Sequence, residues 1–326
     1  MLTRREWLTA ALAALTAPRS VAAQSTSRVL RVGLLSGGAA RSSLAYAAFE
    51  ETLRSLGYVD GTTLQFAFRT AEGRSERLPG LAAELVRSRI DVLVAPGSEA
   101  TLQAARGATT TLPIVVVAID YDPIERGYVA SLARPGGNIT GVFFRQLELT
   151  SKRLELAREL VPKASRMAVL WDADAADQLK AVDATARSLN IALLPLELRR
   201  PPYDYAGAMR TAVQNRAGVV FVLTSVVVFN DRARIAAAAR QHRVPTIFAL
   251  REHVEAGGLL AYGANIADMF RTAAVYVDRI HRGARPAELP VEQPTKFELV
   301  INLTTARALA ITIPPALLAR ADHVIE

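Results

Sequence analysis

Serine residues follow two short apolar segments of this chain, at positions where they could hold an anionic group. Ser36 precedes Gly37 and Gly38 at the end of one segment, and Ser98 follows Pro96-Gly97 at the end of another. A serine that opens a helix leaves backbone N–H groups facing outward, and such groups bind anions without performing chemistry. We therefore expect Ser36 and Ser98 to hold a carboxylate.

Two pairs of aspartates also follow apolar segments. Asp120 is paired with Asp122, and Asp172 with Asp174. Paired carboxylates can perform acid–base catalysis, cap the helix that follows, or meet a cationic ligand group. We expect Asp120 or Asp172 to pair with an ammonium group rather than to take part in catalysis.

The motifs of the common catalytic and metal sites are absent from the sequence. Neither the G-x-G-x-x-G spacing nor the Walker glycine-lysine-serine run occurs, and no G-x-S-x-G elbow surrounds a serine. The histidines lack metal-site spacing; they are His242, His253, His281 and His323. We expect no catalytic residue, no metal and no cofactor.

The first 23 residues have the three parts of a secretory signal peptide. Arg4 and Arg5 precede an uncharged run from Trp7 to Ala17, and Val21-Ala22-Ala23 supplies the small residues of a cleavage site. The run is too short for a bilayer core, which needs about 20 residues. We expect residues 1–23 to direct export to the periplasm; the twin-arginine and general routes both remain open.

Composition narrows the function classes further. The chain has 326 residues, 51% hydrophobic and 21% charged, which is enough for two lobes with their own cores. It has no cysteine, so no disulfide is possible and no lipid anchor follows the signal. The net charge of +8 comes from arginines scattered among acids, as in Lys152-Arg153-Leu154-Glu155. We expect a solvated basic surface, no nucleic-acid partner and a monomer.

Short apolar segments alternate with segments of helical spacing, which indicates parallel strands joined by crossover helices. The pattern occurs twice, so we expect an α/β fold of two Rossmann-like lobes. Each lobe would be a parallel sheet flanked by helices, joined by a three-crossing hinge. The first lobe would comprise residues 28–140 and 264–290, and the second residues 141–263 and 291–326.

Two-lobe α/β proteins bind ligands between the lobes, beyond the carboxyl ends of their strands. Phe143 and Tyr262 could stack on an apolar or aromatic group, and Asn265 could hydrogen-bond across the closed cleft. The full set of candidate ligand-binding residues is Ser36, Ser98, Glu99, Asp120, Asp122, Phe143, Asp172, Ser225, Glu252, Tyr262 and Asn265.

Several long motifs resemble one known family. The turn LGYVDG begins at Leu56, AEGRSERLPGLAAEL at Ala71, YVASLARPGGNITG at Tyr128, and VEQPTKFELVINLTTARALAITIP at Val291. Together with Phe248 to Gly263, they resemble the ABC transporter substrate-binding proteins of the tryptophan/tyrosine-binding type, over nearly the whole chain.

The resemblance implies a type I periplasmic-binding-protein fold that closes over a small molecule, with amino acids as the suggested class, and delivers it to an ABC permease. Two stretches depart from the family pattern: Ile119-Asp120-Tyr121-Asp122-Pro123 replaces a short G-D-P turn, and Trp171-Asp172-Ala173-Asp174 replaces an asparagine-proline pair. These departures leave the identity of the ligand open. The alternatives are a sensor acting through a membrane receptor and an envelope enzyme.

Overall fold

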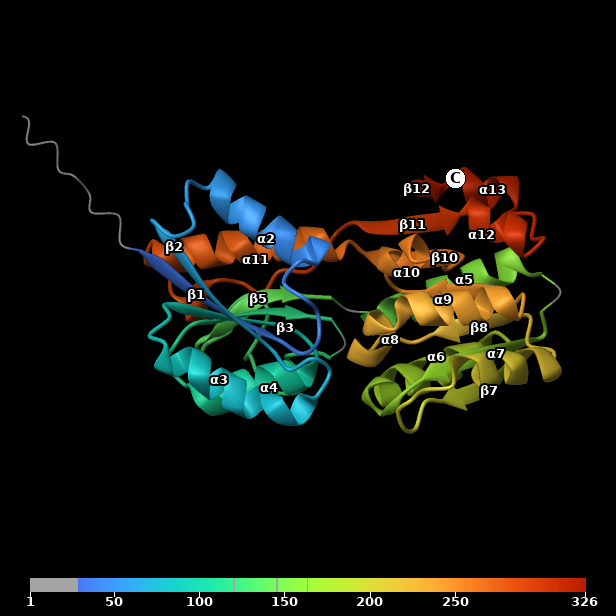
Figure 1. Cartoon of the computed structure of the whole chain (residues 1–326), viewed down its shortest axis with the longest axis horizontal. Helices are drawn as coiled ribbons and strands as arrows, with labels where there is room; N and C mark the ends of the chain where they lie inside the picture. The colour runs from blue at the N-terminus through green and yellow to red at the C-terminus, as the bar shows by residue number, and fades with distance from the viewer. Residues whose placement is uncertain (1–28, 120, 145, 163) are drawn as a thin grey trace, which may run out of the picture.

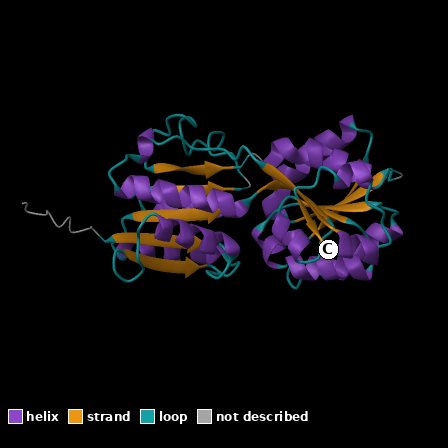
Figure 2. Ribbon diagram, turned by 90° about the horizontal axis from the view of Figure 1, so that it is seen from above, coloured by secondary structure: helices purple, strands orange, loops and turns teal. Residues whose placement is uncertain are grey.

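The computed structural model describes residues 29–119, 121–144, 146–162 and 164–326. Within these residues the chain forms two α/β lobes that lie end to end, each with a sheet between helices (Figure 1, Figure 2). The expected signal peptide and Asp120 lie outside the described residues. No helix in the described part combines the length and apolar character needed to cross a membrane.

The first lobe contains a parallel sheet, which in the described residues has five strands in the order β2-β1-β3-β4-β5. Its strands are β1 (Leu30–Ser36), β2 (Leu64–Thr70), β3 (Val92–Gly97), β4 (Ile114–Ala118) and β5 (Ile139–Phe143). Its helices are α2 (Leu44–Ser55), α3 (Leu78–Arg87), α4 (Glu99–Ala108) and α11 (Ile266–His281).

Both faces of this sheet are buried except along the edge strand β2, which explains why β1, β3, β4 and β5 are nearly continuous apolar runs. Leu30, Val32 and Leu34 pack toward α2 and α11, two helices distant in sequence that lie side by side (Figure 1). Leu35 and Leu93 pack toward α3 and α4 on the other face. The two apolar layers hold the carboxyl ends of the strands in fixed positions.

The second lobe contains a sheet that has, in the described residues, seven strands in the order β12-β11-β10-β9-β8-β6-β7. They are β6 (Arg166–Trp171), β7 (Ala192–Glu197), β8 (Val219–Val222), β9 (Thr246–Phe248), β10 (Leu260–Ala264), β11 (Phe297–Asn302) and β12 (His323–Ile325). The helices are α5 (Thr150–Leu160), α6 (Ala176–Ser188), α7 (Tyr205–Gln214), α8 (Val226–Asn230), α9 (Arg232–Gln241), α10 (Arg251–Glu255), α12 (Leu303–Ala308) and α13 (Pro315–Leu318).

The expected two-lobe α/β fold is confirmed, with one correction to the expectation that both sheets are parallel. Strand β11 runs antiparallel to β10, with Leu260 opposite Ile301. After β10 the chain crosses to the first lobe, forms α11 and returns to the second sheet from the cleft side. It therefore enters beside the carboxyl end of β10 and must run in the opposite direction.

The chain crosses between the lobes after β5, after β10 and before β11 (Figure 1). Strand β5 pairs with β4 along its whole length, from Ile139 to Phe143. The boundary expected between residues 140 and 141 therefore falls inside a strand of the first sheet. The hydrogen bonds to β4 keep the strand in the first lobe until Phe143.

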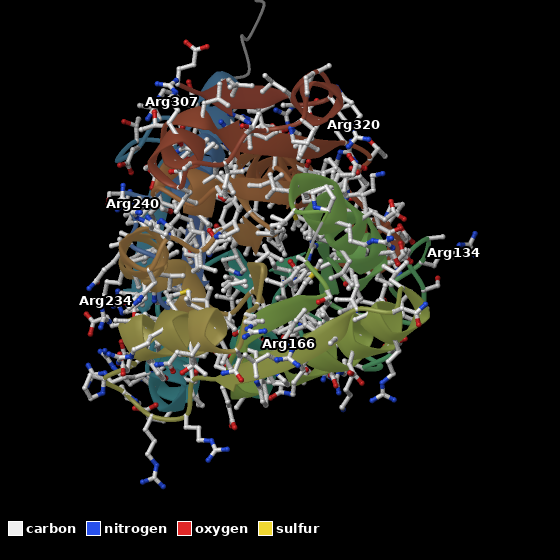
Figure 3. The ribbon with its side chains drawn as sticks, turned by 90° about the vertical axis from the view of Figure 1, so that its right-hand side faces the viewer. Arg134, Arg166, Arg234, Arg240, Arg307 and Arg320 are labelled. Carbon is white, nitrogen blue, oxygen red and sulfur yellow. The ribbon has the colours of Figure 1, made fainter. Side chains whose placement is uncertain are left out.

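The free end of the second lobe carries arginines that are spread over its surface and form no single patch (Figure 3). Arg234 pairs with Asp231, and Arg320 pairs with Glu159. Exposed pairs of this kind contribute little to stability, typically about 0–1 kcal/mol. These two arginines are thus neutralised locally by acids of the same lobe.

Candidate functional site

A cavity of about 100 Å³ lies between the two lobes, at the carboxyl ends of β1, β3 and β8. The first lobe contributes the loop after β1 and the first turns of α2, α4 and α11. The second lobe contributes the segment from Thr224 to Asn230 and Leu250. Among the described residues that line the cavity, none has a charged side chain.

One side of the cavity is polar because two helices begin there. Ser43 is the N-cap residue of α2 and Ser98 that of α4, and neither side chain makes a capping hydrogen bond. The first N–H groups of a helix have no partner within it, so these two starts present free donors and a partial positive charge. The Ser43 hydroxyl is itself buried without a partner.

Two other helix starts near the lobe contact, those of α11 and α8, are capped by a side chain. Asn265 caps α11 by accepting a hydrogen bond from the N–H of Asp268, at 3.2 Å. Ser225 caps α8 in the same way, through the N–H of Val228 at 3.1 Å. Of these four helices, α2 and α4 are the ones whose free N–H groups can bind an external anion; α10, whose N-cap Leu250 is also uncapped and lines the cavity, has only five residues.

The cavity also has an apolar wall, formed by Ile119, Phe229, Leu250, Ile266 and Phe270. Phe270 meets the ring of Tyr46 edge-on, with centroids 5.2 Å apart. Burial raises the pKa of Tyr46 to about 12, so its hydroxyl stays neutral. This wall suits a hydrocarbon or aromatic group.

Ser225 links the cavity to the buried carboxylate of Asp172. The Ser225 hydroxyl donates to Asp172 Oδ2 at 2.5 Å while it accepts from the N–H of Val228. Its one donor is committed, so Ser225 can offer a ligand only an acceptor lone pair. Asp172 Oδ1 is buried without a partner, and burial raises the pKa of this carboxyl group.

The two lobes touch at the Gly37-Gly38 turn. A Cβ atom added to Gly38 would lie 2.8 Å from Val226 Cγ1 and 2.5 Å from Asn230 Nδ2, both in the second lobe. Only a residue without a side chain fits between the lobes at this point. The turn therefore limits how closely the lobes can approach.

The structure brings some of the candidate residues together and separates others. Ser36, Ser98 and Ser225 line the cavity, and Asp172 lies behind Ser225. The Ser36 hydroxyl donates to the carbonyl of Ala39 at 2.8 Å, which shapes the loop after β1. Asp120, which follows the cavity residue Ile119 in the sequence, lies outside the described residues.

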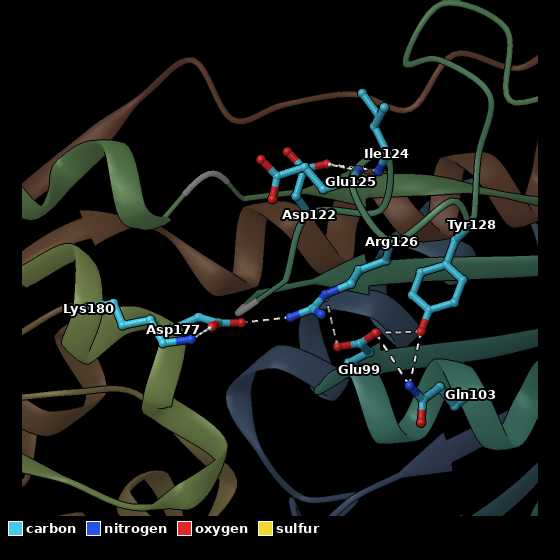
Figure 4. A network of polar contacts seen from close by, with 9 residues as sticks. All are labelled: Glu99, Gln103, Asp122, Ile124, Glu125, Arg126, Tyr128, Asp177 and Lys180. Atoms are coloured by element: carbon cyan, nitrogen blue, oxygen red, sulfur yellow. Dashed lines mark hydrogen bonds and ion pairs between the residues drawn. The ribbon is translucent and has the colours of Figure 1, made fainter.

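Three candidates lie in or beside a second hollow between the lobes. Asp122 and Phe143 line it, and the Asp122 carboxylate accepts from the N–H of Ile124 at 2.8 Å. Glu99 accepts a hydrogen bond of 2.5 Å from Tyr128 and pairs with Arg126 (Figure 4). None of these three is among the described residues that line the first cavity.

The remaining candidates lie in the second lobe or at the hinge, away from the cavity lining. The Tyr262 ring packs against Phe297, and its carbonyl accepts from the buried Arg153 at 2.9 Å. Asn265 caps α11 and reaches Glu298 across the hinge at 3.4 Å. Glu252 is half-buried, with its Oε2 atom buried and without a hydrogen-bond partner, and burial raises the pKa of its carboxyl group to about 7.

Sequence reasoning missed most of the cavity's side chains. Tyr46, Thr101 and Phe229 each stand about one helical turn after an N-cap residue, and Phe270 stands five residues after the N-cap Asn265. The rule that ligands meet strand ends selects the cap itself and ignores the residue one turn later. The spacing between an N-cap residue and the side chain one helical turn later can be read from the sequence, so it is a signal that could have identified these cavity residues.

The described residues contain no group of three or more histidine, cysteine or acidic side chains placed to hold a metal ion. The cavity therefore offers hydrogen bonds, helix-start amides and apolar contact. These are means of binding a small organic molecule.

Residues 37–325 match the model of a family described as ABC transporter substrate binding protein. A tyrosine-binding protein of Clostridioides difficile (strain R20291) is 26% identical over 267 residues, covering 80% of this chain and 75% of that protein. A solved conserved domain protein of Vibrio cholerae is 27% identical, with a TM-score of 0.83, covering 91% of this chain and 100% of the other. An ABC domain of Streptococcus pneumoniae in complex with L-Trp is 24% identical, with a TM-score of 0.81 and the same coverage.

Proposed function

Because the chain belongs to the family of ABC transporter substrate-binding proteins, we propose that it captures a small molecule between its lobes and delivers it to a membrane permease. ATP hydrolysis would occur on another subunit of the transporter. The ligand is bound and released without chemical change. Closure of the lobes about the three crossings holds the ligand, and opening releases it.

One observation carries this proposal: two uncapped helix starts and an apolar wall line the same cavity between the lobes. An anionic group satisfies the free N–H groups, and a hydrocarbon group covers the wall. The orphaned Ser43 hydroxyl marks the polar side as a place where a partner is missing. A carboxylate joined to an apolar or aromatic group fits both sides.

An ammonium group on the same molecule would complete the match. Ser225 offers an acceptor lone pair, and the unpartnered Asp172 Oδ1 supplies negative charge behind it. Asp120 is the other candidate for this role. The relatives named above for tyrosine and crystallised with L-Trp are consistent with an aromatic amino acid as the ligand.

The place of action follows from the N-terminal segment. We propose that residues 1–23 direct export and are removed, so that the mature protein begins at Gln24 and works in the periplasm as a monomer. Cell fractionation with N-terminal sequencing tests this. Recovery of the full-length chain from the cytoplasmic fraction would contradict it.

A thermal-shift screen followed by calorimetry tests the ligand. The panel holds L-tyrosine, L-tryptophan, L-phenylalanine, L-leucine and benzoate, because these vary the ammonium and the apolar part separately. A ligand that binds only the folded protein raises the melting temperature by mass action. We expect an aromatic amino acid to give the largest shift and to be recovered unchanged.

Two variants and a matched control locate the ammonium contact. Asp172→Ala or Asp120→Ala should weaken binding of the amino acid more than binding of benzoate. Asp183→Ala, which removes an exposed acid of α6 paired with Arg187, should leave both unchanged. If neither aspartate variant changes affinity, the charge-pairing idea is wrong; turnover of a ligand would instead support the enzyme alternative.

A further inference from the structure

A second contact joins the lobes beside the ligand cavity. Arg126, in the loop that follows β4 of the first lobe, extends to Asp177 in the first turn of α6 of the second lobe (Figure 4). Arg126 Nη2 lies 2.7 Å from Asp177 Oδ2. The pair borders the second hollow, of about 520 Å³, which shares Ile119 with the ligand cavity.

The arginine is held in place by its own lobe. Arg126 Nε lies 3.4 Å from Glu99 Oε2, and the other oxygen of Glu99 accepts from Tyr128 and from Gln103. Burial, and then the hydrogen bond to Glu99, raise the pKa of Tyr128, so its hydroxyl remains a donor. Arg126 is therefore directed toward the second lobe before the lobes meet.

The aspartate is held by the second lobe in the same way. Lys180 Nζ lies 3.1 Å from Asp177 Oδ1, one turn along α6. Lys180, and then Arg126, lower the pKa of Asp177, which keeps its carboxylate charged. Each lobe thus presents one preoriented charge to the other.

We propose that Arg126 and Asp177 form a clasp that favours the closed arrangement of the lobes without touching the ligand. The inference rests on the proposed function, because a clasp matters only if the lobes open and close around a bound molecule. Neither residue is among the described residues that line the ligand cavity. The clasp therefore sets the balance between open and closed forms, and through it the apparent ligand affinity.

The clasp is weak and sensitive to salt. The side chains of Arg126 and Asp177 are 45% and 53% exposed, and exposed pairs shift an equilibrium by about two- to five-fold. The Debye length falls from about 8 Å at physiological ionic strength to about 3 Å at 1 M salt. High salt should therefore open the lobes, and low salt should close them.

Spin-label distance measurements on the ligand-free protein test the clasp. The chain has no cysteine, so Ser75→Cys in the first lobe and Ala173→Cys in the second, both exposed, give one defined label pair. The distance distribution reports the open and closed fractions directly. No ligand is needed, so a failure of the proposed ligand chemistry would leave this measurement intact.

The variants are Arg126→Gln, Asp177→Asn and their combination, in the labelled background. Each single change should raise the open-to-closed ratio about two- to five-fold, and the combination should raise it no further than the larger single effect. Arg234→Gln, which breaks an exposed pair within the second lobe, is the matched control and should leave the ratio unchanged.

Salt provides the second arm of the experiment. Raising sodium chloride to 1 M should open the parent protein and should have little effect on the Arg126→Gln variant. Circular dichroism confirms that each variant is folded. Identical distributions in parent and variants, additive shifts in the double variant, or equal salt responses would overturn the clasp.

Discussion

Replacing Gly38 with alanine tests whether the lobes close on the cavity as described. The backbone of Gly38 is not in the left-handed region, so alanine adds no conformational strain there. The new Cβ atom would meet Val226 Cγ1 at 2.8 Å and Asn230 Nδ2 at 2.5 Å. Both neighbours belong to the other lobe, so the clash exists only when the lobes are together.

The size of the effect follows from which neighbour can move. The Asn230 amide can rotate away, whereas Val226 is β-branched and has little rotamer freedom in a helix. Overpacking of this kind costs about 1–3 kcal/mol. Because the overpacking destabilises only the closed form, it weakens ligand binding by about 5- to 150-fold.

Calorimetric titration with the strongest binder of the ligand panel measures this change. The matched control is Gly107→Ala, in α4 of the same lobe, where an added Cβ atom meets nothing within 4 Å. The control should bind as the parent does. Parent-like affinity in Gly38→Ala would refute the idea that ligand binding brings the lobes together at this turn.

Three further changes test separate parts of the site and its surroundings. Phe270→Leu keeps the apolar wall but removes the edge-on contact with the Tyr46 ring. In the same titration it should weaken binding of an aromatic ligand about 2- to 10-fold and leave binding of L-leucine unchanged. Ser225→Ala leaves Asp172 Oδ2 buried without its hydrogen-bond donor, so it should lower the free energy of unfolding, measured in urea, by about 1–3 kcal/mol. Unchanged stability would show that this hydrogen bond does not stabilise the fold. Burial raises the pKa of Glu252 from its usual 4.5 to about 7, so the native state holds this proton more tightly than the unfolded chain. The stability from this proton is therefore full below about pH 4.5 and is lost as pH rises through about 7. Glu252→Gln should flatten that pH dependence in urea unfolding at pH 5, 6, 7 and 8, and a parent-like slope would contradict the assignment.

The fold was predictable because its strands are buried on both faces. Runs such as Ile114–Ala118 have no polar face, which is typical of parallel sheets covered by helices. The antiparallel strand β11 was not predictable in the same way. Its direction depends on where the chain re-enters the second sheet, and that is a property of the crossings rather than of the six residues Phe297–Asn302.

The candidate site was predictable only in part, for a geometric reason. Serines at strand ends, such as Ser36 and Ser225, lie at the cavity because parallel strands direct their carboxyl ends to one edge of a sheet. Glu252 and Tyr262 also stand near strand ends, yet neither lines the cavity; Tyr262 packs against the core of the second lobe instead. Which side of the sheet a residue faces depends on packing between segments far apart in the chain.

A crystal structure of the mature protein with the strongest binder of the panel tests the central claim most directly. The account predicts a ligand between the lobes, with its carboxylate at the first turns of α2 and α4 and its apolar group against Phe229 and Phe270. Ser225 would accept a hydrogen bond from the ligand's amine. A ligand bound in the hollow beside Arg126, or on the outer surface of one lobe, would contradict the account.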